Sequence, residues 1–354
     1  MAQTADPAQP PRVGIVGYGM AGATFHAPLL RAAGLTVARV VTTNPQRVAQ
    51  VQADFPEARV ADSVDRLLAG GGLDLVVVAS PSGHHVEHAR AAIEAGVAVV
   101  VDKPLGVDAS SALELVDLAE AERVPLTVFQ NRRYDPEFRT VLDLVQAEAM
   151  GEVRRAELRW ERWRPVPKDR WREQVGPDEG GGLMLDLFTH LLDQAVLLFG
   201  PVDTVYAETA AWTTVGEDDA FAAVRHTSGQ STHVAACSVA GAPGPRWRIT
   251  GSTGTYLLGS AGDEGTAFPD ADGPAGQHGW LVRGDEREAV QARSGDPADF
   301  YRAVAAALAA PDAQAAMPVD PRDAVHVLAV IDAARISAES GRSVEVITPG
   351  QAPE

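Results

Sequence analysis

Cysteine is nearly absent from the chain, which has only Cys237 among its 354 residues. A single cysteine excludes an intrachain disulfide and a cysteine-based metal cluster. Long apolar runs are missing too, because none approaches the roughly 18 residues that a membrane-spanning helix needs. The first eleven residues, MAQTADPAQPP, lack the basic start and apolar core of a signal peptide. These absences predict a cytoplasmic protein.

Basic residues are outnumbered by acidic ones, and the formal net charge is -18 at pH 7. This charge argues against nucleic acid or an anionic membrane as a partner, because both attract basic patches. It leaves room for a phosphorylated cofactor, since backbone N–H groups at a helix start can hold one phosphate. The 45% of hydrophobic and 22% of charged residues are typical of a globular protein. The length suits two domains.

Hydrophobic patterning divides the chain near Asn131. Before it, short apolar runs alternate with helical stretches such as 86–96, which predicts a doubly wound parallel sheet, a Rossmann domain over 11–131. After it, period-two alternation predicts an α+β domain with a mainly antiparallel sheet over 132–350. The glycine-rich stretch 259–279 is expected to be a mobile loop. The expected strands are 12–17, 35–42, 73–80, 97–104, 124–131, 153–163, 204–212, 220–227 and 231–239, and the later helices 136–146, 186–200, 297–310 and 321–340.

A G-x-G-x-x-G motif follows the first expected strand. Gly17 suits a tight turn, Gly19 the close approach of a pyrophosphate, and Gly22 the packing of helix on strand. Met20 and Ala21 would add backbone N–H groups at the helix start. The motif therefore favours dinucleotide binding over a plain strand-to-helix turn.

The end of the second expected strand bears on the choice of cofactor. An acidic residue that would bind the ribose of NAD is missing there. Thr42, Thr43 and Asn44 offer neutral hydrogen bonds, and Arg47 offers a cation that suits a 2′-phosphate. NADP is favoured over NAD, although Arg47 as an ordinary solvated helix residue would leave the choice open.

Two further segments place polar groups where a substrate could lie. Lys103 stands at the carboxyl end of the fourth expected strand, beside the expected cofactor crevice. Asp186, His190 and Asp193 are spaced i, i+4, i+7 and would share one face of a helix. The plainer readings are a turn lysine and a hydrogen-bonded core histidine.

Taken together, these segments resemble the Gfo/Idh/MocA oxidoreductase family. The resemblance rests on the glycine loop, on ASPSGHHVEHARAAIEAGVAVVVDKPLG (79–106) and on GGGLMLDLFTHLLDQ (180–194), and it spans nearly the whole chain. TFHAPLL (24–30) and WRPVPKDRWREQ (163–174) are similar to the branch of scyllo-inositol-type, NADP-preferring dehydrogenases. The family's usual E-K-P appears here as D-K-P. The resemblance implies an NAD(P)-dependent dehydrogenase with a Rossmann domain and a mostly antiparallel α/β domain. It also implies catalytic positions at Lys103, Asp186 and His190, and cofactor contacts at Ser80, Pro81, His85, Asp102 and Lys103.

The chemistry of alcohol oxidation needs residues of these types. A hydride moves to the nicotinamide while a base removes the hydroxyl proton, and His190 titrates in the right range for that base. Asp186 could orient the histidine or bind substrate, and Lys103 would stabilise the developing alkoxide. We expect hydride transfer to a sugar or cyclic polyol in a cleft between the domains, in a homodimer or homotetramer.

Aromatic and basic residues in the loop before the expected catalytic helix, and polar residues at the end of the last Rossmann strand, are candidates for sugar binding. An aromatic ring can stack on a sugar and arginine can bridge hydroxyl groups, although packing with a solvated rim is an equally open reading. Together with Asp186 and His190, the candidates are Asn131, Arg132, Trp163, Arg164 and Trp171.

Parts of the sequence also suit two other functions. His84, Glu87 and His88 satisfy the zinc-peptidase pattern H-x-x-E-H, but they begin a helix at the expected cofactor crevice without a third ligand, so no metal is predicted. A non-catalytic NADP-binding sensor or scaffold is the other alternative. The presence of both Lys103 and His190 favours catalysis.

Overall fold

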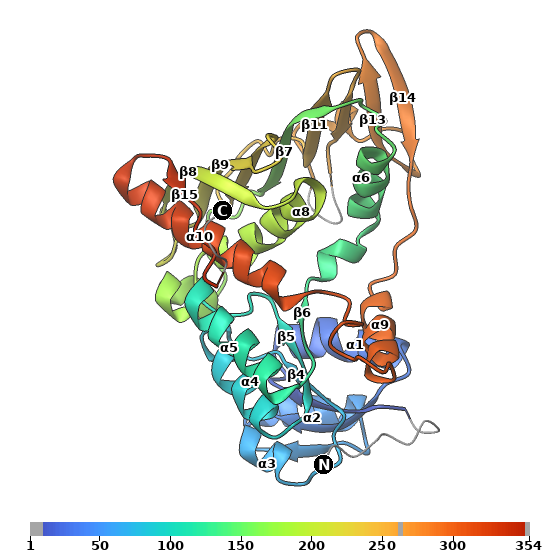
Figure 1. Ribbon diagram of the computed structural model, residues 1–354, viewed down its shortest axis with the longest axis vertical. Helices are drawn as coiled ribbons and strands as arrows, with labels where there is room; N and C mark the ends of the chain where they lie inside the picture. The colour runs from blue at the N-terminus through green and yellow to red at the C-terminus, as the bar shows by residue number, and fades with distance from the viewer. Residues whose placement is uncertain (1–9, 261–264, 351–354) are drawn as a thin grey trace. The chain divides into compact units, whose positions relative to one another are not determined.

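The computed structural model describes residues 10–260 and 265–350 (Figure 1). Its internal contacts define two compact units. One runs through Asn131 and also takes Pro297–Val325, a segment that the sequence predicts in the second domain; the other consists of Arg132–Asp296 and the chain from His326 onward. In the part of the chain that the structure describes, no helix is both long and apolar enough to cross a membrane.

The first unit contains a six-stranded parallel sheet in the order β3-β2-β1-β4-β5-β6. Every residue of β4 and β6 is buried, as expected for parallel strands covered on both faces. Gln314 covers the edge strand β6, because its Oε1 accepts a hydrogen bond from Leu126 N at 2.8 Å. The strands are β1 (Arg12–Val16), β2 (Thr36–Val41), β3 (Arg59–Ala61), β4 (Leu75–Val78), β5 (Ala98–Asp102) and β6 (Leu126–Phe129).

Helices follow most of these strands. The glycine loop leads into η1 (Ala21–His26), a turn of π-helix that continues as α1 (Ala27–Ala32). The α2 helix begins after Asn44, whose side chain accepts hydrogen bonds from Gln46 N and Arg47 N. The helices are α2 (Pro45–Asp54), α3 (Val64–Leu68), α4 (His85–Glu94) after the 3-10 turn η2 (Ser82–His84), α5 (Ala109–Glu122) and α9 (Asp299–Leu308).

The second unit contains a nine-stranded sheet in the order β14-β13-β12-β11-β7-β10-β9-β8-β15. Only β7 and β10 pair in parallel, and the other pairs are antiparallel. Side chains alternate between buried and partly exposed along β9 and β10, so one face packs on the core. The strands are β7 (Val153–Glu161), β8 (Val202–Ala210), β9 (Asp219–His226), β10 (Ser231–Cys237), β11 (Trp247–Gly251), β12 (Thr255–Leu258), β13 (Gln277–Arg283), β14 (Glu286–Gln291) and β15 (Val344–Glu345).

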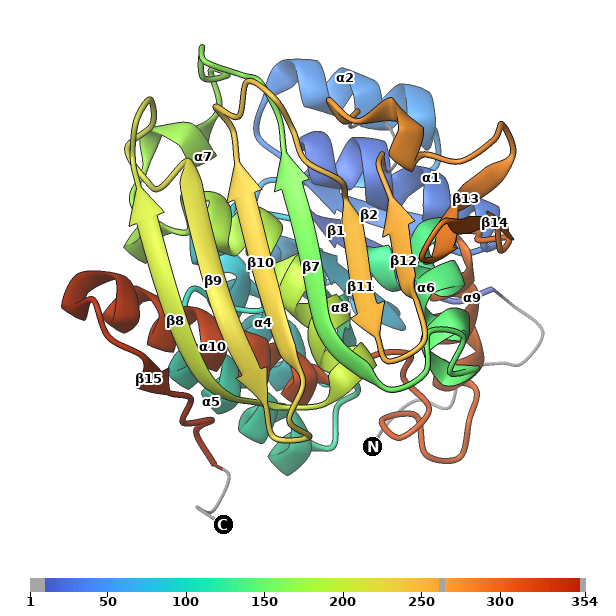
Figure 2. The same cartoon turned by 90° about the horizontal axis from the view of Figure 1, so that it is seen from above.

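One face of this sheet is covered by helices α6, α8 and α10, which lie behind it in Figure 2. The α8 helix continues from η5 (Met184–Phe188), a second turn of π-helix. The α10 helix begins in the first unit and continues in the second. The helical segments are η3 (Asn131–Tyr134), α6 (Pro136–Gln146), α7 (Trp171–Gln174), η4 (Pro177–Glu179), α8 (Thr189–Phe199), η6 (Pro269–Ala271) and α10 (Pro321–Ser340).

The predicted fold class is confirmed: a parallel Rossmann sheet is followed by a mainly antiparallel sheet with helices. The short edge strand β3 was not predicted, because three residues are too few for a periodic signal. Within the expected loop 259–279, residues 261–264 lie outside the described residues. The described remainder contains η6 and the start of β13.

Candidate functional site

The glycine loop leaves no room for side chains at two of its three glycines. Gly17 has φ +95°, and a Cβ built on it would lie 2.7 Å from Ala79 O. A Cβ on Gly22 would collide with Gly17 O, so the first turn of the helix lies directly against the loop. Only glycine meets both conditions, because any other residue would strain the backbone or displace it. The loop therefore has the close-packed form that a dinucleotide cradle requires.

The backbone amide groups in the first turn of the next helix come directly after the glycine loop. The hydrogen bond from Ala23 N to Gly19 O, at 2.9 Å, is an early one of this helix, so the N–H groups of Met20, Ala21 and Gly22 lie in the first turn, where intrahelical acceptors are lacking. The Arg47 guanidinium faces the same loop, 3.8 Å from a Cβ built on Gly19. These donors fit the phosphates of a dinucleotide.

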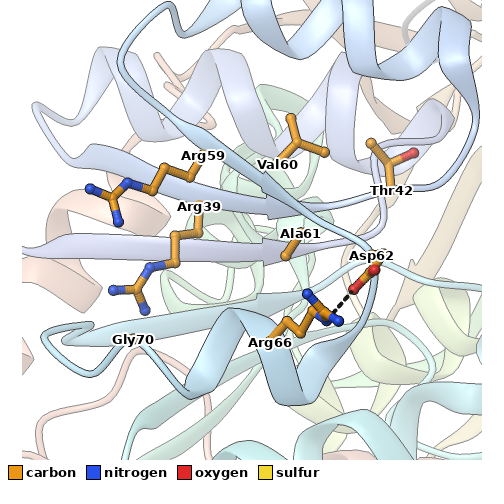
Figure 3. A pocket seen from close by; sticks show the side chains of 8 residues that line it. All are labelled: Arg39, Thr42, Arg59, Val60, Ala61, Asp62, Arg66 and Gly70. Carbon is orange, nitrogen blue, oxygen red and sulfur yellow. Dashed lines mark ion pairs between the residues drawn. The ribbon is translucent and has the colours of Figure 1, made fainter.

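The end of β2 opens onto a pocket of about 350 Å³ (Figure 3). Thr42, which is buried, lines it, whereas Thr43 is exposed and Asn44 caps α2. Arg66 pairs with Asp62 at 3.2 Å within the pocket wall. The remaining lining residues are Arg39, Arg59, Val60, Ala61 and Gly70. A surface this rich in arginine, on a chain of net charge -18, suits an anion.

The D-K-P segment is held from both sides. Asp102 Oδ1 accepts a hydrogen bond from Lys103 N at 2.9 Å. The buried ring of His85 bridges two loops, with Nδ1 2.7 Å from Pro104 O and Nε2 2.9 Å from Ser80 O. Burial acts to raise the pKa of Asp102, but His26, His85 and Lys103 outweigh it and hold that pKa below its ordinary value. The structure thus brings Ser80, His85, Asp102 and Lys103 together.

The histidines beside this segment have partners of their own. His88 Nδ1 lies 2.9 Å from Ser80 Oγ, and burial lowers the pKa of His88. His84 Nδ1 lies 3.6 Å from Glu87 Oε2. Over residues 10–260 and 265–350, no group of three potential metal ligands is found.

In the second unit, Glu217 holds the start of the segment that carries Asp186 and His190. Gly182 has φ +85°, and a side chain there would collide with the Glu217 carboxylate. Glu217 Oε1 accepts a hydrogen bond from Met184 N at 3.0 Å, and Glu217 O accepts one from Leu183 N at 2.9 Å. A carboxylate at a helix N-terminus stabilises it both as a hydrogen-bond acceptor and through the helix dipole.

Asp186 and His190 have different neighbours, and between them the π-helical turn gives way to α8. Asp186 Oδ1 lies 3.4 Å from Arg172 Nη1, and the Arg172 guanidinium stacks on Trp171 at 4.9 Å. Asp193, the third member of the predicted face, forms a two-pronged ion pair with Arg133 at 2.6 and 2.8 Å. Because Asp193 is 2% exposed, this ion pair anchors α8 to η3.

His190 lies in an aromatic and cationic environment. Its ring is 5.8 Å from that of Trp160, which also contacts the guanidinium groups of Arg132 at 4.9 Å and Arg246 at 4.3 Å. The structure therefore brings two predicted residues, His190 and Arg132, onto one tryptophan. The His190 side chain is buried, with 6% of its surface exposed.

The remaining predicted substrate residues lie in the segment after β7 and at the start of η3. Trp163 is 60% exposed and forms an isolated bridge with Val239, and Arg164 N donates to Ser238 O at 2.6 Å. Asn131 begins η3 and is partly exposed.

Sequence reasoning missed three residues of this environment: Arg172, Glu217 and Arg246. Arg172 lay within the arginine-rich segment and adjoins Trp171, so its neighbourhood was a usable signal. Glu217 and Arg246 are 31 and more residues from Asp186 in the sequence, and only the fold of the second sheet brings them near. No local pattern could have singled them out.

Fold and site together define a dinucleotide-dependent oxidoreductase, and comparison with known proteins gives the family. A model of the oxidoreductase family with an NAD-binding Rossmann fold matches residues 11–130, and the GFO/IDH/MocA C-terminal domain matches residues 138–257. The chain belongs to the Gfo/Idh/MocA family. It is an NAD(P)-dependent oxidoreductase that acts on a small-molecule substrate.

Sequence relatives and solved structures align with nearly the whole of this chain. The oxidoreductase YdgJ of Escherichia coli K12 is 35% identical over 91% of this chain and 94% of its own. The scyllo-inositol 2-dehydrogenase (NADP(+)) IolW of Bacillus subtilis 168 is 30% identical over 94% and 95%. The structure of the oxidoreductase YvaA of Bacillus subtilis superposes with a TM-score of 0.85 at 26% identity, covering 97% of this chain and 100% of that one.

Proposed function

We propose that the protein is an NADP-preferring dehydrogenase of a sugar or an inositol-like cyclic polyol. The observation that carries the cofactor preference is Arg47, whose guanidinium faces the glycine loop where Gly19 has no side chain. The missing acidic residue at the end of β2 agrees with it. The name of IolW, an NADP(+)-dependent scyllo-inositol dehydrogenase, supports the same substrate class and cofactor.

The residues of the first unit bind the cofactor in this proposal. The first-turn amides of Met20, Ala21 and Gly22 hold the pyrophosphate, and Arg47 with Thr42 and Thr43 holds the 2′-phosphate. Ser80, Pro81, His85 and Asp102 shape the loops beside it. A dinucleotide held by these residues would supply a nicotinamide able to accept a hydride from the substrate or to return one.

Lys103, Asp186 and His190 act on the substrate oxygen. In the oxidative direction, the hydroxyl proton passes to His190 as the C–H hydride leaves, and the Lys103 ammonium stabilises the negative charge on the oxygen. Asp186, paired with Arg172, binds a second hydroxyl group or orients His190. In reduction the imidazolium returns the proton.

Trp160, Trp171 and the arginines around them contact the ring of the substrate in this proposal. Trp160 is already stacked with Arg132 and Arg246, and Trp171 with Arg172. Guanidinium groups of this kind are rigid forks for paired hydroxyl or carboxylate oxygens. Trp163 and Arg164 would contribute from the adjoining loop, and Asn131 from the end of β6.

The chain offers a matched test because its only lysines are Lys103, which is buried, and Lys168, which is exposed. We expect Lys103→Ala to lower kcat with NADP about 100-fold or more, as removal of a charge-stabilising group does. NADPH binding, followed by fluorescence, should stay within about threefold because the loop donors remain. Lys168→Ala should behave as the unchanged protein.

His190→Ala should also lower kcat about 100-fold, as expected for loss of a general base. His226→Gln, at a buried histidine of the same unit, is its control. Full turnover of either Lys103→Ala or His190→Ala would remove that residue from the catalytic set. Tight NADPH binding by the unchanged protein without turnover of any polyol or keto sugar would favour the alternative function, a non-catalytic NADP-binding sensor or scaffold.

A further inference from the structure

A buried histidine connects the glycine-loop helix of the first unit to the D-K-P segment. His26 is the last residue of η1, and its side chain is fully buried. Its ring lies 4.3 Å from that of Phe129 in β6 and 6.0 Å from that of Tyr301 in α9. Phe300 completes an aromatic cluster around the pair. Three elements distant in sequence thus meet at one imidazole.

Both nitrogens of His26 face polar atoms within this cluster. Nδ1 lies 2.5 Å from the Tyr301 hydroxyl oxygen, and Nε2 lies 3.7 Å from Asp102 Oδ2. The other oxygen of that carboxylate, Oδ1, accepts the hydrogen bond from Lys103 N. Asp102 therefore stands between His26 and the backbone of Lys103.

The direction of the hydrogen bonds follows from the chemistry of the partners. Burial holds the pKa of Tyr301 well above its ordinary value, so the hydroxyl group keeps its proton. When it donates that proton to Nδ1, the neutral imidazole carries its own hydrogen on Nε2. That N–H then lies on the side of the Asp102 carboxylate, whose Oδ2 is 3.7 Å from Nε2, so the two groups attract each other electrostatically across a gap slightly longer than a hydrogen bond. Tyr301 thus selects the tautomer of His26 that turns an N–H toward Asp102.

Stability alone gives a weak reason for this arrangement. A tyrosine hydroxyl and an imidazole buried among Phe129 and Phe300 lose hydration, and a well-packed apolar pair avoids that cost. What an apolar pair lacks is a directed donor for Asp102. The polar pair is needed only if the position of that carboxylate matters.

We propose that His26 and Tyr301 are positioning residues, which hold the Asp102 carboxylate and through it the placement of Lys103. The proposal rests on the proposed function of Lys103 as the group that stabilises the substrate oxygen. Neither His26 nor Tyr301 touches the substrate in it. They act in the order Tyr301 O–H, His26, Asp102, Lys103.

The first test reads the tautomer and does not depend on activity. In the full-length protein with ¹⁵N-labelled histidine, we expect pyridine-type Nδ1 and pyrrole-type Nε2 signals for His26, assigned by their loss in His26→Gln. Tyr301→Phe removes one oxygen from an aromatic cluster and should fold. It should shift His26 toward the other tautomer. A pyrrole-type Nδ1 in the unchanged protein would overturn the proposed hydrogen-bond direction and with it the proposal.

The second test measures Lys103 directly. Acylation of the amines, read by mass spectrometry, gives the rate at Lys103 with exposed Lys168 as the internal standard in the same sample. We expect Tyr301→Phe and His26→Gln to change the Lys103-to-Lys168 ratio at least about threefold, the equivalent of one lost hydrogen bond. The matched controls are Tyr256→Phe and His226→Gln, which remove buried hydrogen-bonding groups from the second unit.

Kinetics complete the test. Tyr301→Phe and His26→Gln should lower kcat about three- to tenfold, with the KM for NADPH within about twofold, because the amide cradle is untouched. If these variants and their controls had the same Lys103-to-Lys168 acylation ratio and the same kcat, the positioning role would be overturned. If Lys103→Ala kept full activity while the tautomer and labelling results held, the proposed function would fail and the link to Lys103 would stand.

Discussion

Trp160 shows how one side chain organises the surroundings of a candidate catalytic group. Its ring contacts His190 and the guanidinium groups of Arg132 and Arg246. The ring quadrupole holds both guanidinium groups over Trp160, beside the imidazole of His190. A neutral His190 is the form that accepts a proton from an alcohol. The identity of Trp160 therefore bears on the chemistry as well as on packing.

Arg47 gives the sharpest prediction for a single residue. We expect Arg47→Ser to raise the KM for NADP about tenfold, because a charge-assisted hydrogen bond contributes roughly 1.5–3 kcal/mol. The KM for NAD should change less than about twofold, since NAD has no 2′-phosphate. Steady-state kinetics with NADP and with NAD measures both KM values and so the difference between the two effects. Arg90→Ser, on α4, is the control, and an equal effect on both cofactors would contradict the assignment.

At the level of elements, both candidate sites begin with a turn of π-helix. The η1 turn carries the glycine-loop amides and ends at His26, and η5 carries Asp186 just before His190. Such wide turns are rare and recur at functional sites, where they redirect side chains. The i, i+4 spacing of Asp186 and His190 predicts one regular α-helical face, whereas in the structure Asp186 lies in the π turn and His190 in α8. The contact of Asp186 with Arg172 joins two separate segments, so the spacing within one helix does not predict it.

The connection between α8 and the β9–β10 hairpin gives a pH prediction. His226, at the end of β9, lies 2.7 Å from Gly200 O and 2.9 Å from Thr232 Oγ1, so the neutral ring satisfies both partners. Burial lowers the pKa of His226 below 6.5. Below pH 6.5 the unfolded chain binds a proton that the folded protein does not. The free energy of unfolding should therefore fall as the pH falls through 6.5 toward the lower folded-state pKa.

Urea unfolding between pH 7.5 and 5.5 measures this effect. We expect the free energy of unfolding to fall less steeply with falling pH in His226→Gln than in the unchanged protein, because glutamine does not titrate. The same slope in both proteins would exclude His226 as its source.

At the level of the whole molecule, we propose that the face of the nine-stranded sheet opposite α6, α8 and α10 forms a homo-oligomer interface. The three large helices of the second unit lie on the opposite face (Figure 2). Ala235 in β10 pairs with Phe221 in β9 and with Arg159 in β7, and all three are partly exposed. A wide sheet face that carries small, aromatic and charged side chains is suited to the same face of a second copy, since a two-fold interface is self-complementary.

A charge at the centre of this face tests the interface. Ala235→Glu should convert a dimer or tetramer into monomers, since a buried unpaired carboxylate costs several kcal/mol at an interface. Sedimentation velocity measures the oligomeric state. Gln52→Glu adds the same charge to an exposed position of α2 and should leave it unchanged. A monomeric unchanged protein would refute the interface.

Local chemistry, read from the sequence, predicted the Rossmann sheet, the glycine cradle and the second sheet. Continuous apolar runs such as LVVV in β4 are typical of buried parallel strands, and Gly17 and Gly22 stand where only glycine fits. These features are local, because each depends on a few neighbouring residues and the backbone they permit.

Tertiary structure alone decided which distant side chains meet. The contacts of Trp160 with Arg246, of Met184 N with Glu217, and of His26 with Tyr301 join residues 33 to 275 positions apart. Their geometry depends on strand order and helix packing, which no short pattern contains. The sequence by itself thus determined the elements and the chemistry available to them, and the fold determined which groups act on one another, since hydrogen bonds and ring contacts act over only a few ångströms.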